Sequence, residues 1–297
     1  EVLKVSIPRA FTLSLNQIVL LVFISIASTL AVGSVSVFQF AYNLQSVPLA
    51  IIGVSYSVAA FPILAELFTK QKNELFNFHI TTALRHIIFW SLPVIALLVV
   101  LRAQVVRVIL GSGEFDWSDT RLTAAVLALL SLSLVFQAIN LLATRSFYAA
   151  GNTRVPLLSA VLGSVSAIVF SFLFLNLFKT SEVFQVALTS LMRVETLVGS
   201  EVLVLALAYS VGVFIQVICL VVFLSRTFSI SLRWMPLHIL RSLLAALVGG
   251  GVSYLTLNLV VSGINPDTLV GIFLQGFIAG VAGIVAIILT YWAVGSP

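Results

Sequence analysis

The feature that most constrains this chain is a polar line inside an apolar stretch long enough to cross a membrane. Residues 34–66 are mostly apolar, yet Gln39, Asn43 and Ser46 recur at positions i, i+4 and i+7, which share one face of a helix. Small residues continue this face at Ala50, Gly53 and Ser57. Unsatisfied polar groups are costly in hydrocarbon, so the face must meet another helix or a wet cavity. The pattern predicts the wall of a pathway.

The composition indicates a protein with several membrane-spanning helices. Hydrophobic residues make up 61% of the chain and charged residues 8%, with a mean hydropathy of +1.20, whereas about a quarter of a soluble domain is charged. The single cysteine, Cys219, excludes an internal disulfide. No Cys/His spacing suits a metal and no catalytic arrangement stands in a suitable context, so neither an enzyme nor a cofactor is expected. The net charge of +5 gathers at segment ends, which favours membrane topology over nucleic-acid binding.

Hydropathy predicts an all-α polytopic membrane protein in one unit, residues 1–297, with about eight spanning helices, since each span needs about 20 apolar residues. The predicted spans are 10–32, 36–65, 82–101, 123–148, 156–177, 202–225, 237–261 and 268–294. Residues 180–199 are predicted to form an amphipathic helix that lies on the outer surface or packs against the bundle. Its apolar face would hold Val183, Ala187, Leu191, Val194 and Val198.

The basic residues predict how the spans are oriented. Most lysines and arginines fall on the side of the two chain ends, whereas most acidic residues fall on the opposite side. Because cytoplasmic loops carry an excess of lysine and arginine, both ends of this chain are expected in the cytoplasm.

Amides and hydroxyls are the candidates for a pathway, because the middle of every span lacks acidic and basic residues. The predicted substrate cavity comprises Asn16, Gln17, Gln39, Tyr42, Asn43, Ser46 and Ser57. Gln45 lies off this line and is assigned to the rim only. Taken one at a time, these groups could instead form hydrogen bonds between helices.

Two other patterns allow two interpretations each. Arg145 and Arg154 bracket a cytoplasmic turn, where they either set topology or bind phosphate groups at the membrane surface. The last two spans are marked by glycines, which either let helix backbones approach closely or form a shallow groove for a lipid tail. The glycines assigned to that groove are Gly249, Gly250, Gly276 and Gly280.

Four motifs follow one another along the first half of the chain. They are SIPRAFTLSLNQI (6–18), GSVSVFQFAYNLQSVPLAIIGVSYSVAAFPILAEL (33–67), LGSGEFDWSDT (110–120) and RSFYAAGNTRVP (145–156). Together they resemble the MviN/MurJ-type lipid II flippases of the multidrug/oligosaccharidyl-lipid/polysaccharide exporter superfamily. The fourth is similar to that family's cytoplasmic turn, and the residues assigned to it here are Arg145, Tyr148, Asn152, Thr153 and Arg154.

The resemblance implies a fourteen-helix protein with two lobes around a central cationic cavity, of which this chain is similar to the second lobe. It implies a bacterial cytoplasmic membrane protein, and a missing N-terminal lobe that supplies several cavity arginines. The chain is therefore expected to be a fragment. On this resemblance, the last two spans would form the groove for a polyprenyl tail.

One departure from the family concerns the residues that the resemblance assigns to binding the diphosphate. Where the family has an Asp-Arg-Leu triplet, this chain has Tyr42, Asn43 and Leu44. An amide can donate hydrogen bonds to a diphosphate but brings no charge, so it should bind the diphosphate more weakly than an arginine.

The leading hypothesis is a flippase for an undecaprenyl-diphosphate-linked peptidoglycan precursor, lipid II, that works by alternating access. Its expected partners are this precursor, membrane lipids and the missing lobe, with no nucleic acid. Coupling to an ion gradient or to the membrane potential is left open. A second hypothesis keeps the fold with another lipid-linked oligosaccharide or a drug as cargo. A third is a membrane scaffold that recruits envelope enzymes without transporting anything.

Overall fold

The computed structural model describes residues 2–111, 113–260, 263 and 268–295, and every regular element in these ranges is a helix. The α-helices are α1 (Val2–Ser28), α2 (Ser34–Leu49), α3 (Ser55–Thr69), α4 (Asn73–Val100), α5 (Arg102–Leu110), α6 (Trp117–Ser131), α7 (Leu134–Ala149), α8 (Arg154–Thr180), α9 (Glu182–Met192), α10 (Val202–Phe228), α11 (Met235–Leu255) and α12 (Leu269–Ala293). Two short π-helices, η1 (Ala50–Val54) and η2 (Thr256–Val260), continue α2 and α11. The all-α prediction is confirmed. Residue 112 of the third motif and residue 261, the predicted end of a span, lie outside the described residues.

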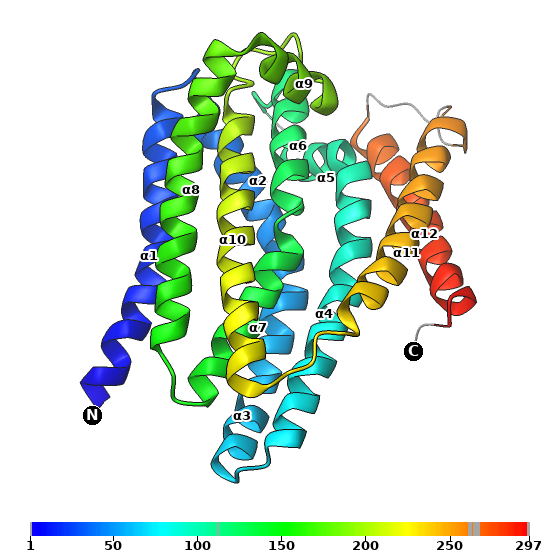
Figure 1. The fold of residues 1–297 in the computed structure, drawn as a ribbon. Helices are drawn as coiled ribbons and strands as arrows, with labels where there is room; N and C mark the ends of the chain where they lie inside the picture. The colour runs from blue at the N-terminus through cyan, green and yellow to red at the C-terminus, as the bar shows by residue number, and fades with distance from the viewer. Residues whose placement is uncertain (1, 112, 261–262, 264–267, 296–297) are drawn as a thin grey trace.

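Seven helical segments in the described ranges are long and apolar enough to cross a membrane, and a bent pair makes an eighth candidate. The bent pair is α6 and α7, which meet at 43°, and the predicted span 123–148 falls on it. The segment from α2 through η1 to α3 is 36 residues long. At 1.5 Å per residue it reaches about 54 Å against a hydrocarbon core of about 30 Å. Its lower end, with the start of α4, projects below the other helices in Figure 1.

The helices form a bundle with one pair set to the side (Figure 1). α8 packs along α10, with α1 against α8, while α2 packs on α6 and α3 on α7. One buried cluster centres on α6 and α10, and a second lies between α4 and α7. α11 and α12 pack on each other and reach the bundle through α4 and α5.

The amphipathic helix differs from its prediction in length and in the face that it buries. α9 ends at Met192, where Arg193 adopts a φ of 61°. Leu188 is buried, and Phe184 and Met192 pack on the core. Of the predicted apolar face, Val183 and Leu191 are 81% and 71% exposed, whereas Val194, beyond the end of α9, is buried in the core. The helix carries two apolar stripes one residue apart, and periodicity alone did not identify the one that packs inward.

Two arginines hold the C-terminal end of α9 over the bundle. Arg102 donates a hydrogen bond of 3.1 Å to the carbonyl oxygen of Met192, and Arg121 donates one to the carbonyl oxygen of Arg193. Burial, followed by repulsion from Arg193, lowers the pKa of Arg102, although a guanidinium remains charged at neutral pH. Cations at the C-terminal end of a helix also complement its dipole, so this contact fixes which stripe of α9 faces inward.

The start of α6 is fixed by a reciprocal cap. The Asp116 carboxylate accepts a hydrogen bond of 2.8 Å from the backbone N–H of Asp119, and the Asp119 carboxylate accepts one of 3.2 Å from the backbone N–H of Asp116. The Asp119 backbone N–H, followed by the Ser118 hydroxyl, lowers the pKa of Asp116. These bonds satisfy two backbone donors that a helix start leaves free.

Asp116→Ala should lower the free energy of unfolding, because the start of α6 would lose its cap. Because the folded-state pKa of Asp116 is lowered, its stabilisation should be complete above the unfolded value of about 3.9 and should disappear as the pH falls through the lower folded value. Thermal unfolding of detergent-solubilised protein at several pH values measures this. Glu114→Ala is the control, because Glu114 is an exposed neighbour. An equal loss of unfolding free energy in both variants would contradict a stabilising role of the Asp116 cap.

Candidate functional site

The N-terminal part of the polar line, in α2, lies on one exposed face of the helix, and the spacing predicted the shared face. Gln39, Asn43 and Ser46 are all exposed, and the Ser46 hydroxyl donates a hydrogen bond of 2.6 Å to the Asn43 carbonyl oxygen. The side-chain amides of Gln39 and Asn43 are thus open to a ligand or to another part of the protein. Their role in a substrate cavity stays a prediction.

The C-terminal part of the polar line does not lie on this surface. Ala50 is exposed, but Gly53 and Ser57 are buried. The cause is η1, since a π turn inserts one extra residue and rotates the following residues by roughly 100° relative to an α-helix. Gly53 then packs on α7, where an added Cβ would lie 3.0 Å from the Ala138 Cα. The assignment of Ser57 to the cavity is therefore wrong, because its side chain is fully buried and bonds to the Val54 carbonyl oxygen.

Gln45 is a core residue, so its assignment to the rim is also wrong. It is 1% exposed, and its side-chain N–H donates hydrogen bonds of 3.0 Å to the Leu130 carbonyl oxygen and 3.2 Å to the Ser133 hydroxyl. Gln137 donates to the same hydroxyl and accepts from the Tyr209 hydroxyl. This network fills the break between α6 and α7, which is the interhelical bonding that the sequence left as an alternative.

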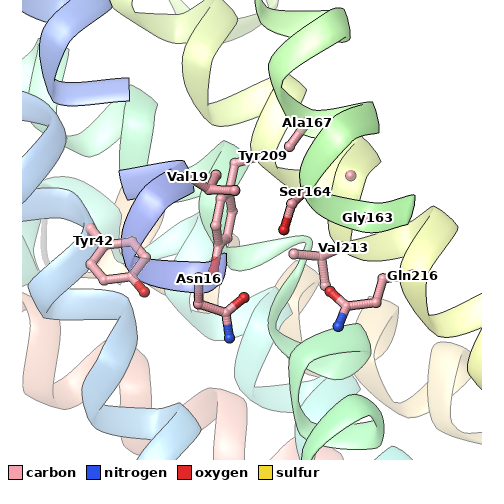
Figure 2. A pocket seen from close by; sticks show the side chains of 10 residues that line it. Asn16, Val19, Tyr42, Gly163, Ser164, Ala167, Tyr209, Val213 and Gln216 are labelled. Carbon is pink, nitrogen blue, oxygen red and sulfur yellow. The ribbon is translucent and has the colours of Figure 1, made fainter. Parts of the chain in front are cut away.

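A small polar crevice connects the exposed face with α8 and α10. It has a volume of about 30 Å³, and its polar lining comes from Asn16, Tyr42, Ser164, Tyr209 and Gln216 (Figure 2). The Tyr42 ring meets the Tyr209 ring edge to face at 5.8 Å. So small a volume admits only a few water molecules.

The first helix contributes two exposed amides beside this crevice. Asn16 is exposed and reaches the crevice, whereas Gln17 is exposed on α1 outside its lining. The polar surface of α1 and α2 is here called the polar face and comprises Asn16, Gln17, Gln39, Asn43 and Ser46. It is a surface of amides and a hydroxyl, and it can bind a polar group only through hydrogen bonds.

The turn motif is explained first by the end of α7. The backbone N–H of Asn152 donates a hydrogen bond of 2.9 Å to the Phe147 carbonyl oxygen, and that of Gly151 donates one of 3.0 Å to the Tyr148 carbonyl oxygen. This is a Schellman motif, which requires a left-handed residue, and Gly151 supplies a φ of 73°.

The same turn also starts α8. The Asn152 side-chain oxygen accepts hydrogen bonds from the backbone N–H groups of Arg154, at 3.1 Å, and Val155, at 3.3 Å. Thr153 is buried and Arg154 is exposed. The spacing of Gly151 and Asn152 therefore has a structural cause, and phosphate binding by Arg154 stays a prediction.

The sequence analysis did not single out Arg9, which joins the turn residues in space. The Arg9 guanidinium lies 4.8 Å from the centroid of the Tyr148 ring, a cation–π contact. Arg145 is close enough to Arg9 for their charges to repel. The first motif, SIPRAFTLSLNQI, contains Arg9 and was the available signal, but only the tertiary structure pairs it with α7.

An apolar groove, here called the α4–α11 groove, runs between α11 and the bundle. Two adjoining cavities of about 680 and 470 Å³ form it, with walls from α4, α7, α10 and α11. The two cavities share Leu92, Val135, Phe136 and Leu243. A groove of this size and apolarity, open on the side of a membrane-spanning bundle, suits a lipid chain.

The four glycines assigned to a single tail groove have different neighbours. Gly250 lines the α4–α11 groove, whereas Gly249 faces α12, since an added Cβ would lie 2.2 Å from Ile287. Gly276 lines a separate cavity of about 210 Å³ between α5 and α12, and Gly280 faces Leu101. The structure therefore does not bring the four together in one groove. Close packing accounts for Gly249, as the alternative interpretation proposed.

Comparisons with known proteins agree with this architecture. The family model described as lipid II flippase MurJ matches residues 1–273. The lipid II flippase MurJ of Thermosipho africanus is 29% identical over 136 residues, which cover 46% of this chain and 28% of that protein. The probable lipid II flippase MurJ of Vibrio cholerae is 29% identical over 169 residues, which cover 57% of this chain and 32% of that protein.

A solved structure supports the fold. The structure described as lipid II flippase MurJ in an inward closed conformation superposes with a TM-score of 0.73 at 24% identity, covering 98% of this chain and 54% of that one. The helices and their surfaces thus define a multi-pass membrane protein with the fold of part of a flippase. The family match extends over most of the chain. The chain belongs to the MurJ lipid II flippase family, and it spans about half the length of the solved relative.

Gln45→Leu should destabilise the protein by about 1 kcal/mol for each hydrogen bond removed, because the buried Leu130 carbonyl and Ser133 hydroxyl would each lose one of their hydrogen bonds. Thermal unfolding in detergent measures this cost. Gln39→Leu is the matched control, since Gln39 is exposed on the same helix and its replacement should change stability little. Equal effects of the two substitutions on thermal stability would show that the hydrogen-bond network of Gln45 does not stabilise the break between α6 and α7.

Proposed function

We propose that the protein carrying this chain translocates a lipid-linked peptidoglycan precursor, lipid II, across the bacterial cytoplasmic membrane. The observation that carries the proposal is the match of residues 1–273 to the lipid II flippase family. Two surfaces support it: the polar face suits a hydrophilic headgroup, and the α4–α11 groove suits an apolar tail. Each would handle one part of an amphipathic substrate. The work is transport, with no covalent step by this chain.

The headgroup would cross along the polar face, with Gln39 and Asn43 as its hydrogen-bonding groups. Asn16, Gln17, Tyr42 and Ser46 would complete this wall. Because the matched relatives are longer than the segment they share with this chain, we propose that a second lobe closes the cavity from the other side. Rocking of two lobes about a bound substrate is the usual logic of transporters built from two halves.

The membrane orientation forms part of the same proposal. Both ends of the chain would lie in the cytoplasm, since the basic residues gather on that side. The polyprenyl tail would remain in the bilayer beside α11, in the α4–α11 groove. An ion gradient or the membrane potential would drive the cycle, and the potential acts directly on a substrate whose diphosphate is charged.

A different cargo is the second candidate function, and Asn43 favours it. This side chain is uncharged where the family resemblance places an arginine, and no other residue of the polar face is charged. Binding of another lipid-linked oligosaccharide, or of a drug, would depend less on a positively charged side chain. Binding of such a lipid without binding of lipid II would support this alternative. A non-transporting scaffold instead predicts that substitutions on the polar face have no effect.

Asn43→Arg should strengthen binding of the diphosphate headgroup by roughly ten-fold, because a charge-assisted hydrogen bond is worth about 1.5–3 kcal/mol against about 1 for a neutral one. Asn43→Leu should reduce translocation. The measurement is rescue of bacterial cells depleted of their own lipid II flippase, together with movement of labelled lipid II in vesicles. Val47→Leu, an exposed apolar position on α2, is the control. No rescue and no movement by the complete wild-type gene product would refute the proposed function.

A further inference from the structure

Two arginines and two histidines meet where α4 packs against α11, and they are here called the cationic cluster. Arg85 and His86 come from α4, and His238 and Arg241 come from α11. The His238 Nε2 lies 2.9 Å from the Arg85 carbonyl oxygen, and the Arg85 guanidinium lies 4.9 Å from the centroid of the Trp234 ring. Arg241 and His86 also lie close to His238.

The cluster has no acidic partner within the described part of the chain, where the one ion pair joins Lys70 to Glu66. Arg85 and His86 are exposed, and His238 and Arg241 are half-buried. Arg85 and Arg241 carry the positive charge of the cluster at neutral pH, and the two histidines add hydrogen-bonding groups. The cluster is therefore complementary to an anion supplied from outside the chain.

The α4–α11 groove begins directly beside the cluster. Ile88, one turn after Arg85 on α4, lines the groove, as does Ile239, the neighbour of His238 on α11. From there the groove continues past Leu92 to Tyr254 near the other end of α11. A ligand that fills both sites has an anionic head and a long apolar tail. Basic sites between membrane helices on the cytoplasmic side are typical places for lipid phosphates.

We propose that the cationic cluster binds the diphosphate of a polyprenyl-diphosphate lipid whose tail lies in the α4–α11 groove. The cluster is thus a loading site, distinct from the polar face along which the headgroup would cross. This inference rests on the proposed function and adds the place where the substrate is first held. Arginine binds phosphate oxygens in a bidentate manner, and two arginines match the two phosphates of a diphosphate better than the single phosphate of a membrane phospholipid.

The test measures binding of radiolabelled undecaprenyl diphosphate to the complete gene product in phosphatidylcholine nanodiscs. Replacing Arg85 and Arg241 together by glutamine should weaken binding about 25-fold, or about five-fold for each arginine. Arg226→Gln is the matched control, since Arg226 is exposed at the end of α10, outside the cluster, and its loss should leave binding within about two-fold.

A second variant tests the groove without touching any charge. Gly251 lines the groove, and an added Cβ there meets no atom within 4 Å, so Gly251→Phe is chosen to place a bulky side chain in the groove. This substitution should weaken binding of undecaprenyl diphosphate but not that of inorganic diphosphate. Thermal unfolding of all variants verifies that each is folded.

The outcomes separate this inference from the proposed function. Equal binding by the wild type and by the Arg85/Arg241 variant would overturn the loading site and leave translocation along the polar face intact. Displacement of the probe by phosphatidylglycerol would assign the cluster to a membrane phospholipid and overturn it as well. If inorganic diphosphate displaced the probe as strongly as unlabelled undecaprenyl diphosphate does, the groove would be excluded as part of the binding site. No binding by the wild type would overturn the loading site, whereas the proposed function is tested separately by rescue of depleted cells and by movement of lipid II in vesicles.

Discussion

The break between α6 and α7 is the constraint on which the packing of the bundle depends. It lies within a membrane-spanning pair that bends by 43°, where backbone carbonyls without partners would be costly. The Leu130 carbonyl oxygen receives the Gln45 side chain from α2, and the Leu129 carbonyl oxygen receives the Ser210 hydroxyl from α10. One irregular site thereby joins three parts of the bundle, and the two helices that satisfy it are held in register by hydrogen bonds.

This constraint also separates the two surfaces of the molecule. α2 must direct Gln45 inward while Gln39 and Asn43 face outward, and η1 then turns Gly53 onto α7. The polar face consequently ends where η1 begins, instead of continuing down the helix. On the other side of the bundle, α11 is held by α4 and α12, and the space it leaves against α7 and α10 becomes the α4–α11 groove.

The proposed function gives these surfaces a common meaning. A lipid-linked precursor has a polar headgroup and a long apolar tail, and the chain offers one surface suited to each. The positive charge, however, lies beside the groove and at the turn of α7, not on the polar face, where Asn43 brings only hydrogen bonds. This separation of charge from the polar face is why substitutions at Asn43 and at Arg85 test different steps.

The sequence by itself determined the helices, because apolar runs of about 20 residues have the length at which an α-helix, and not the shorter β-strand, spans the hydrocarbon core. It also determined that Gln39, Asn43 and Ser46 share a face, whereas the structure showed that the turn after α7 needs Gly151. Only the tertiary structure showed that Ser57 and Gln45 are buried and that Arg9 contacts Tyr148. It also showed which of the two stripes of α9 packs inward. Periodicity assumes 3.6 residues in every turn, which η1 violates, and Gln45 finds its partner 85 residues away. Such contacts depend on how helices pack, and the pattern within one helix does not contain that information.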